Sequence, residues 1–120
     1  MKSIKWWQKH VMDWCERKGW NENLVLGNMI ANLMSEVSEA WEEIRNGHTA
    51  NETYTSTEFH RSTTGLPNIE KPEGFPIELA DLFIRLVHLC EVYNIDLEAM
   101  VKYKMAYNEK RPYRHGGKTA

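Results

Sequence analysis

Four stretches of the chain carry apolar residues at steps of three and four, the spacing of an amphipathic helix. They cover residues 3–18, 24–46, 76–93 and about 97–109. The third stretch is apolar almost all round, which is typical of a buried helix. We find neither a strand pattern nor an internal repeat. The sequence therefore predicts an all-α fold, a bundle of about four helices.

Residues at the ends of these stretches are suited to starting and stopping helices. Ser3 and Asp96 can cap the first and fourth helices with their side-chain oxygens. Gly19 and the pair Asn46 and Gly47 fit positions just beyond a helix end. The helix boundaries are therefore expected close to these residues.

Two other segments carry few apolar residues. Residues 47–74 are rich in Thr, Ser, Asn, Gly and Pro and predict a long loop between the second and third helices. Loops of this length are usually functional or disordered. Residues 110–120 predict a basic, flexible tail, with glycines at 116 and 117. We expect the 120 residues to form a single domain.

The charge of the chain is unevenly distributed. The net charge is −2, which argues against general affinity for nucleic acid. Residues 35–44 are acidic and contain no Lys or Arg, whereas residues 101–120 are strongly basic. A protein that binds both a metal ion and a polyphosphate could use this division, and two solvated helix faces would produce the same pattern.

The sequence favours a cytoplasmic protein that does not insert into membranes. It has no signal-peptide pattern and no apolar run of the length that spans a bilayer. The two cysteines, Cys15 and Cys90, stand in apolar patterns, as packed thiols of a reducing compartment do.

Four carboxylates predict a metal site. Glu36 and Glu39 project from one side of the second helix, and Glu78 and Asp81 repeat this spacing on the third. Carboxylates that converge in a partly buried place repel one another, and a divalent cation removes that cost. Magnesium prefers oxygen ligands of this kind, and manganese is a possible substitute.

The spacing of the acidic residues is also compatible with side chains that bind no metal. Two glutamates three residues apart on a helix are common and usually solvated. Glu78 and Asp81 also suit the first turn of a helix, where the helix dipole favours negative charge. Arg85 stands four residues after Asp81 and can pair with it.

The basic end of the chain predicts a phosphate-binding surface. Lys104, Asn108 and Arg111 follow steps of four and three and share a helix face, with Tyr107 beside them. Arg114 follows on the tail. Such side chains bind phosphates well. The alternative is a basic helix C-terminus in solvent, which the helix dipole also favours. No P-loop motif is present.

Taken together, these motifs resemble the MazG-type family of all-α nucleoside triphosphate pyrophosphohydrolases, in the short form of bacteria and phages. The similarity covers about residues 20–118 apart from the long loop, which separates the two acidic pairs more widely than in shorter members. It is carried by the acidic pairs of EVSE and ELAD followed by a basic segment, and the strings that show it best are KPEGFPIELADLFIRLVHLCEVYNIDLE and KMAYNEKRPYRHGGK.

The resemblance implies an activity and a set of site residues. The reaction would convert a ribo- or deoxynucleoside triphosphate and water into the monophosphate and pyrophosphate. The catalytic and magnesium-binding residues would be Glu36, Glu39, Glu78 and Asp81. The substrate-binding residues would be Lys104, Tyr107, Asn108, Arg111 and Arg114.

The resemblance also implies assembly into a homodimer or homotetramer, which agrees with an apolar third helix and five tryptophans in so short a chain. Trp7, Trp20 and Trp41 are candidates for stacking on the base, and each could equally belong to a core or an interface. The competing hypothesis is a catalytically silent helical oligomer that binds a nucleotide or a partner and regulates it. A structural helical oligomer with solvated acidic faces is a further alternative.

Overall fold

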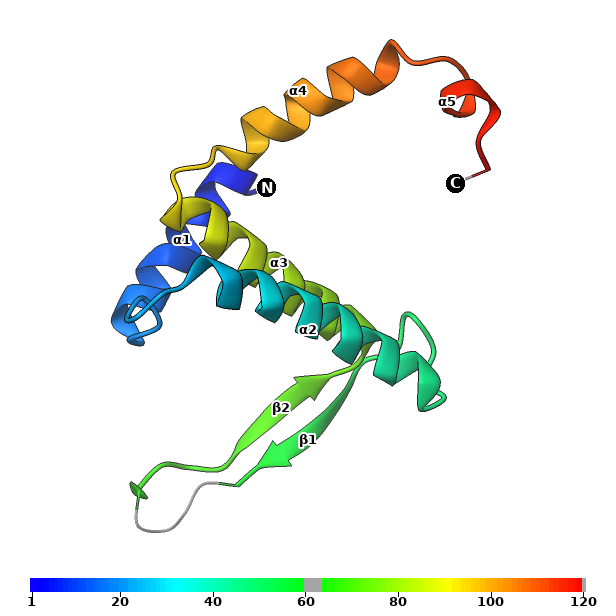
Figure 1. The fold of residues 1–120 in the computed structure, drawn as a ribbon. Helices are drawn as coiled ribbons and strands as arrows, with labels where there is room; N and C mark the ends of the chain where they lie inside the picture. Colours follow the sequence, from blue (N-terminus) through cyan, green and yellow to red (C-terminus); the bar gives the residue numbers. More distant parts are fainter. Residues whose placement is uncertain (60–63, 120) are drawn as a thin grey trace. The chain divides into compact units, whose positions relative to one another are not determined.

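The computed structural model describes residues 1–59 and 64–119, and it is mostly helical with one two-stranded sheet (Figure 1). Each of the four predicted helices is confirmed, with ends within two residues of the expected positions. The elements in chain order are α1 (Ile4–Arg17), α2 (Leu26–Arg45), β1 (Tyr54–Glu58), β2 (Ile69–Glu73), α3 (Phe75–Val92), α4 (Leu97–Glu109) and the short α5 (Arg114–Gly117).

The chain divides into two compact units. The terminal unit consists of Met1–Glu22 and Val87–Ala120, and the central unit is Asn23–Leu86. The central unit therefore holds α2, the two strands and the first part of α3. The terminal unit holds α1, the last part of α3, α4 and α5.

The helix caps of the terminal unit are those that the sequence predicts. The Ser3 hydroxyl accepts a hydrogen bond from the Trp6 amide at 3.0 Å and begins α1. The Asp96 carboxylate accepts one from the Ala99 amide at 3.0 Å and begins α4. Each bond satisfies an amide that the helix itself leaves without a partner. α5 is a single short turn within the tail that was expected to be flexible.

A buried glutamine organises the core of the terminal unit. The Gln8 side-chain amide donates to the Ile95 carbonyl at 2.8 Å and to the Glu91 carboxylate at 3.2 Å. Its oxygen accepts from the Leu97 amide at 3.2 Å. These bonds join α1 to the end of α3, the turn after it and the start of α4, and they satisfy a side chain that is otherwise removed from water. The buried apolar residues of this unit are Val11, Cys15, Val87 and Cys90, and both cysteines are free.

The sheet corrects two predictions, the purely all-α fold and the long loop over residues 47–74. β1 and β2 pair in antiparallel register, from Tyr54 opposite Glu73 to Glu58 opposite Ile69 (Figure 1). Both strands consist mainly of polar residues that stay exposed, so they show no alternation of apolar and polar positions. The pairing depends on cross-strand hydrogen bonds rather than on burial, and such strands leave little signal in the sequence.

Side-chain contacts connect the base of this hairpin to the end of α2. The Tyr54 hydroxyl contacts both carboxylate oxygens of Glu43, at 2.8 and 3.0 Å. This hydrogen bond raises the pKa of Tyr54 to about 12. The His48 ring stacks on the Tyr54 ring at 4.6 Å, and its Nδ1 lies 2.7 Å from a Glu52 oxygen. The hairpin is therefore held to α2 at its base.

Gly74 joins the hairpin to α3 in a conformation that other residues rarely adopt. Its φ is +122°, and a Cβ built there would lie 2.4 Å from the Glu52 carbonyl oxygen. We expect Gly74→Ala to lower the free energy of unfolding by about 1–3 kcal/mol, because it adds both backbone strain and a clash with main chain. Urea unfolding measures this effect.

Gly27→Ala is the matched control for Gly74→Ala. Gly27 lies inside α2, where an added Cβ would meet nothing within 4 Å. Alanine in a helix is favoured over glycine by up to about 1 kcal/mol, so this variant should unfold at the same or a higher urea concentration. Equal stability of the two variants would show that a Cβ at Gly74 causes neither a clash nor backbone strain.

The apolar third helix is less buried than expected. On α3 only Val87 and Cys90 are buried among the described residues, and Leu79 is 44% exposed. The single chain therefore does not bury this helix all round, although its apolar sequence predicted that it would. Among the helices of the described residues, none combines the length and the apolar character needed to cross a membrane.

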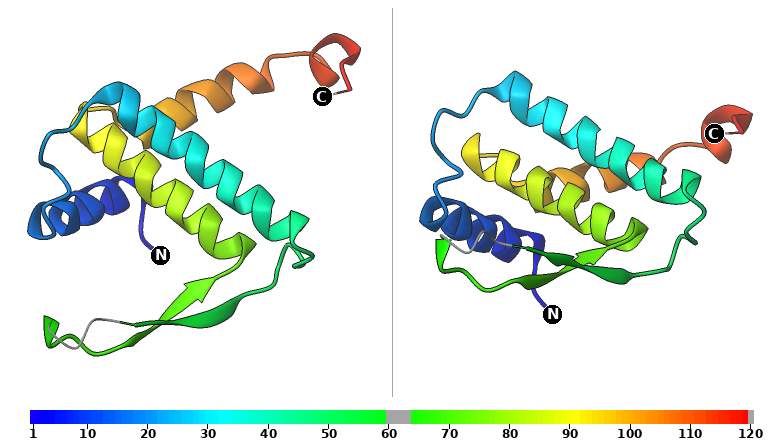
Figure 2. Two further views of the ribbon diagram at one scale, coloured as in Figure 1. Left: turned by 60° about the horizontal axis from the view of Figure 1, so that its bottom comes forward. Right: turned by 90° about the horizontal axis from the view of Figure 1, so that it is seen from below.

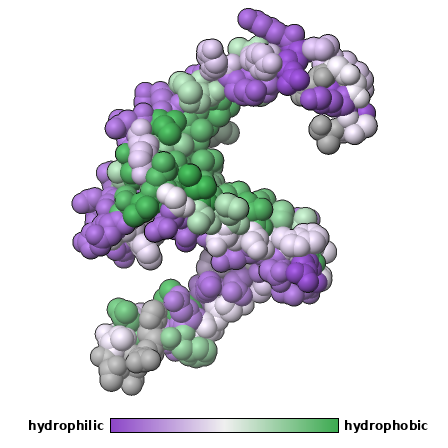
Figure 3. Space-filling model, viewed as in Figure 1, coloured by the Kyte–Doolittle hydropathy of each residue, from purple (hydrophilic) through white to green (hydrophobic). Residues whose placement is uncertain are grey.

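Large apolar side chains also remain exposed on α2 and α4. α4 has no buried residue. On the face shown in Figure 3, hydrophobic residues gather over α2 and α3, whereas the far end of α4 is hydrophilic. The exposed apolar residues of α2 are Leu26, Ile30, Met34, Val37 and Trp41.

Candidate metal centre

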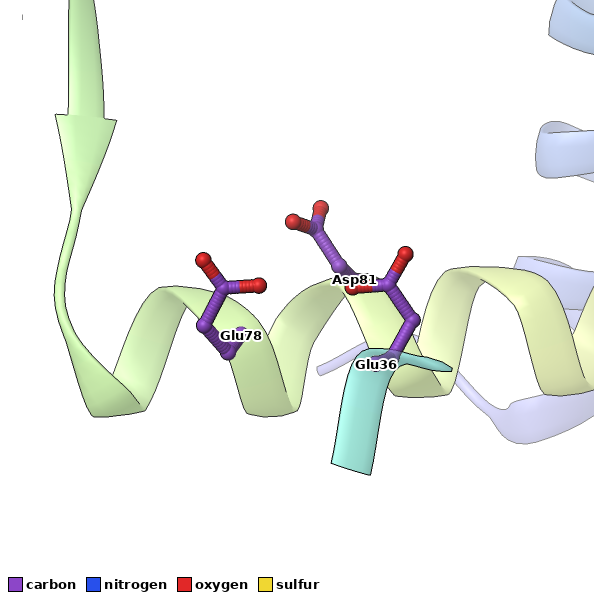
Figure 4. Close-up of side chains that lie close together, drawn as sticks. All are labelled: Glu36, Glu78 and Asp81. Carbon is purple, nitrogen blue, oxygen red and sulfur yellow. The ribbon is translucent and has the colours of Figure 1, made fainter. Parts of the chain in front are cut away.

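The acidic residues of α2 and α3 meet within the central unit. α2 and the first part of α3 lie side by side (Figures 1 and 2). Glu36 extends from α2 toward Glu78 and Asp81, which project from one side of α3 (Figure 4). One carboxylate oxygen of each of the three residues lies within 4.8 Å of the others. Three of the four predicted metal ligands are therefore close enough to share one cation.

Glu39, the fourth predicted ligand, lies at the border of this cluster. Its side chain is exposed, and it does not belong to the group of three. It is nevertheless close enough to Glu78 to help raise the pKa of that carboxyl group, so it borders the cluster without belonging to it.

The surroundings of the cluster oppose full ionisation. Burial, the neighbouring Glu39 carboxyl group and the charges of Asp81 and Glu36 raise the pKa of Glu78 to about 7. Burial and the charge of Glu36 also raise the pKa of Asp81, while Arg85 and Lys71 act in the opposite direction. Carboxylates in such surroundings gain most from a bound cation, because the cation favours the charged form of each of them.

Two oxygens of the cluster lack hydrogen-bond partners. Glu36 is only 5% exposed, and its Oε1 accepts a hydrogen bond from Arg85 Nε at 2.6 Å. Its Oε2, like Oε2 of Glu78, is buried without a partner among the described residues. A buried oxygen left in this way costs about 1–3 kcal/mol. The donor set, all carboxylate oxygens on two helices, fits a magnesium ion better than zinc.

No family model, curated protein or solved structure matches the chain. The MazG-type resemblance therefore stays a prediction, and the candidate site rests on its own geometry. The spacing of the acidic residues did not decide whether they face one another or solvent. In the structure the acidic sides of α2 and α3 face each other.

The predicted substrate-binding residues lie in the terminal unit. Lys104 and Arg111 both approach the ring of Tyr107, with Nζ 4.7 Å and Cζ 5.8 Å from its centroid. Asn108, on the next position of α4, donates a hydrogen bond to the sulfur of Met105 at 3.8 Å. The structure therefore places the charged groups of Lys104 and Arg111 beside the exposed ring of Tyr107.

Arg114, the last predicted substrate-binding residue, stands apart from that group. It begins α5, and its guanidinium lies 5.9 Å from the ring centroid of Tyr113. The acidic cluster and the basic residues belong to different units. Their joint use of one substrate is therefore a proposal.

Sequence reasoning did not assign two features of the described surface. Tyr103 is 79% exposed and lines a shallow depression on α4, which also includes Lys104, Ala106, Tyr107 and Lys110. Its spacing of four residues from Tyr107 was the available signal. Helix spacing offered Asp81 as one possible partner of Arg85, and the hydrogen bond of Arg85 to Glu36 connects residues 49 positions apart.

The tryptophans proposed for base stacking are all at least partly exposed. Trp7 is 37% exposed, Trp20 62% and Trp41 58%. Trp7 packs edge to face against Trp6 with ring centroids 5.0 Å apart, in an aromatic group on α1. Exposure permits stacking on a base and also permits a subunit interface, so the assignment of a stacking residue stays a prediction.

Proposed function

We propose that this protein is a magnesium-dependent nucleoside triphosphate pyrophosphohydrolase. The observation that carries the proposal is the cluster of Glu36, Glu78 and Asp81, with two buried carboxylate oxygens that lack partners among the described residues. The order of the acidic and basic motifs, which resembles that of MazG-type enzymes, supports it. The proposed biological role is cleaning or controlling the nucleotide pool of a bacterial or phage-infected cell.

In this proposal each group of residues has a distinct task. Glu36, Glu78 and Asp81, with Glu39 at their border, would hold the cation, and one of these carboxylates would accept the proton of the attacking water. When bound, magnesium neutralises the triphosphate and lowers the pKa of a coordinated water.

The remaining tasks belong to residues of α4 and to the substrate itself. Lys104 and Arg111 stabilise charge that builds up on the phosphates. Water cleaves the bond between the α and β phosphates, so that one product takes the water oxygen and the other takes the electron pair of the broken bond, giving the monophosphate and pyrophosphate.

Product analysis tests this function directly. The purified protein is incubated with ribo- and deoxynucleoside triphosphates, with magnesium or with EDTA, and the products are separated by ion-exchange chromatography. We expect magnesium-dependent formation of monophosphate and pyrophosphate from at least one nucleotide. Release of diphosphate and phosphate would contradict the proposed reaction, and no turnover of any triphosphate would favour a silent binding protein.

The exposed helix faces favour that second candidate, a helical oligomer that binds a nucleotide or a partner without hydrolysis. α4 has no buried residue and α2 exposes a row of large apolar side chains, as surfaces that receive another molecule do. The two candidates differ in product formation. A silent binding protein should still gain thermal stability from magnesium and a nucleotide but leave the nucleotide intact.

We propose that a second copy of the chain covers the apolar row on α2. Ile30, Met34, Val37 and Trp41 follow steps of four, three and four residues and are 46–68% exposed. This is the spacing of the core positions in paired helices, and a two-fold axis can bring the same row from each copy together. The row includes a tryptophan, a residue that often anchors interfaces.

Val37→Glu is expected to convert the oligomer into a monomer, because it places a charge in the middle of this apolar row. Light scattering coupled to size exclusion at micromolar concentration measures the mass. Asn28→Glu adds the same charge at an exposed position on another side of α2 and should leave the assembly intact. A monomeric wild-type protein would contradict the proposed interface.

A further inference from the structure

Arg85 connects the acidic cluster to solvent. It lies on α3 one turn after Asp81, and its Nε donates to Glu36 Oε1 at 2.6 Å. The two partners differ in exposure, since the side chain of Glu36 is 7% exposed and that of Arg85 is 48% exposed. One edge of the guanidinium is therefore held against a buried carboxylate, while much of the side chain stays in contact with water.

Most of the donor groups of Arg85 are unused. A guanidinium carries five N–H groups, and four of them belong to the two terminal nitrogens. The contact with Glu36 uses Nε, and the terminal nitrogens have no hydrogen bond or ion pair within the described part of the chain. The pairing is thus one-sided, although an arginine and a carboxylate commonly pair through two parallel hydrogen bonds.

Because this pairing uses only one nitrogen and one oxygen, each partner keeps polar atoms for other contacts. Glu36 keeps its Oε2, which is buried without a partner among the described residues, and one of its oxygens lies within 4.8 Å of an oxygen of Glu78 and of Asp81. Arg85 keeps its two terminal nitrogens, which form the planar fork that matches two oxygens of a phosphate. Lys71, the other cation that influences Asp81, is already paired with Glu73 at 3.8 Å.

We propose that Arg85 binds a phosphate of the nucleotide with its terminal nitrogens while its Nε holds Glu36. The inference rests on the proposed function and adds to it a substrate-binding residue on the same helix as two of the proposed metal ligands. Because the guanidinium is already fixed by Glu36, less side-chain freedom is lost when a phosphate binds. A phosphate bridging the cation and Arg85 would also bring opposite charges together in a partly buried place.

The test measures metal binding and phosphate binding separately in Arg85→Gln. Binding of Mn²⁺ alone is followed by electron paramagnetic resonance, and binding of inorganic pyrophosphate at saturating Mg²⁺ is followed by calorimetry. Removal of a positive charge beside the cluster should leave Mn²⁺ affinity unchanged or raise it. Pyrophosphate affinity should fall at least about tenfold, because charge-assisted hydrogen bonds are lost.

Two further variants make the comparison specific. Arg85→Lys keeps the charge but not the planar fork, so it should restore part of the pyrophosphate affinity and should fold even where glutamine disturbs Glu36. Arg45→Gln is the matched control, because Arg45 also pairs with a glutamate of α2, Glu42, at 3.0 Å on the exposed surface. It should change neither affinity.

The outcomes separate this inference from the function on which it rests. Pyrophosphate affinity within about twofold of wild type in Arg85→Gln would refute phosphate binding by Arg85. Equal losses of Mn²⁺ and pyrophosphate affinity would also refute it, because they would show that Arg85 only supports Glu36. A wild-type protein that binds no Mn²⁺ would overturn the proposed metal site itself, and the role of Arg85 with it.

Discussion

Asp81→Ala is expected to reduce magnesium-dependent pyrophosphate release at least about a hundredfold while the helices stay folded. Asp81 supplies one of three oxygens that lie within 4.8 Å of one another, so its loss leaves the cation with fewer ligands and a displaced position. Initial rates at saturating magnesium, with circular dichroism on the same samples, measure both parts of the prediction. Glu39→Ala should behave similarly if the border residue takes part in catalysis.

The stability of Asp81→Ala separates a functional loss from a folding defect. Burial and the charge of Glu36 raise the pKa of Asp81, so its ionised form is unfavourable in the metal-free protein. Removing it should leave the melting temperature without magnesium unchanged or higher. Glu42→Ala is the control, since Glu42 is exposed on α2 and pairs with Arg45. Full activity in both Asp81→Ala and Glu39→Ala would refute the metal assignment.

The helices could be predicted because their signals are local. Ser3 and Asp96 lie within three residues of the amides that they cap, so the sequence shows donor and acceptor together. Apolar residues at helical spacing also predict α2 and α3 whatever their surroundings. Exposure, in contrast, depends on what packs against a helix. The apolar sequence of α3 accordingly predicted more burial than the single chain provides.

The hairpin could not be predicted because its determinants are distant or unpatterned. Tyr54 pairs with Glu73, which lies far along the sequence, and neither strand has an apolar face. The contacts that fix its base involve Glu43 of α2 and the main chain at Gly74, which only the folded chain brings near. A segment rich in polar residues and glycine is equally compatible with a loop.

The candidate site could also be predicted only in part, because the spacing within each helix is visible in the sequence and the packing of the helices is not. The spacing of Glu36 with Glu39, and of Glu78 with Asp81, placed each pair on one side of a helix. Whether the two sides face each other depends on the packing of α2 against α3. The hydrogen bond from Arg85 to Glu36 spans 49 positions, whereas helix spacing could offer Arg85 only a partner on its own helix, Asp81. The residue proposed to bind phosphate therefore emerged only from the fold.

Magnesium is expected to reverse the pH dependence of the protein's stability. In the folded, metal-free chain the pKa of Glu78 is raised from 4.5 to about 7, first by burial and then by the neighbouring carboxylates. A group whose pKa is higher in the folded state stabilises the fold fully below its unfolded pKa, and this stabilisation is lost as pH rises through its folded pKa. Metal-free protein should therefore lose about 1–2 kcal/mol between about pH 4.5 and pH 7.5, after allowance for solvent screening.

With magnesium the sign of this dependence changes. The cation binds the ionised carboxylates, so protons compete with it, and its stabilising effect grows as pH rises through the range in which Glu78 titrates. Thermal unfolding at about pH 5 and about pH 8, with and without magnesium, measures the effect. We expect melting curves that differ little at the lower pH and separate by several degrees at the higher pH.

Glu78→Gln identifies the group responsible, because glutamine has the shape of the protonated side chain and cannot ionise. In this variant the metal-free stability should fall less as pH rises over this range, and magnesium should stabilise the protein much less. Glu42→Gln, a change on the exposed side of α2, should behave like the wild type. Parallel curves with and without magnesium in the wild type would mean that the converging carboxylates need no cation, and the acidic residues would then fit a structural helical oligomer better than an enzyme.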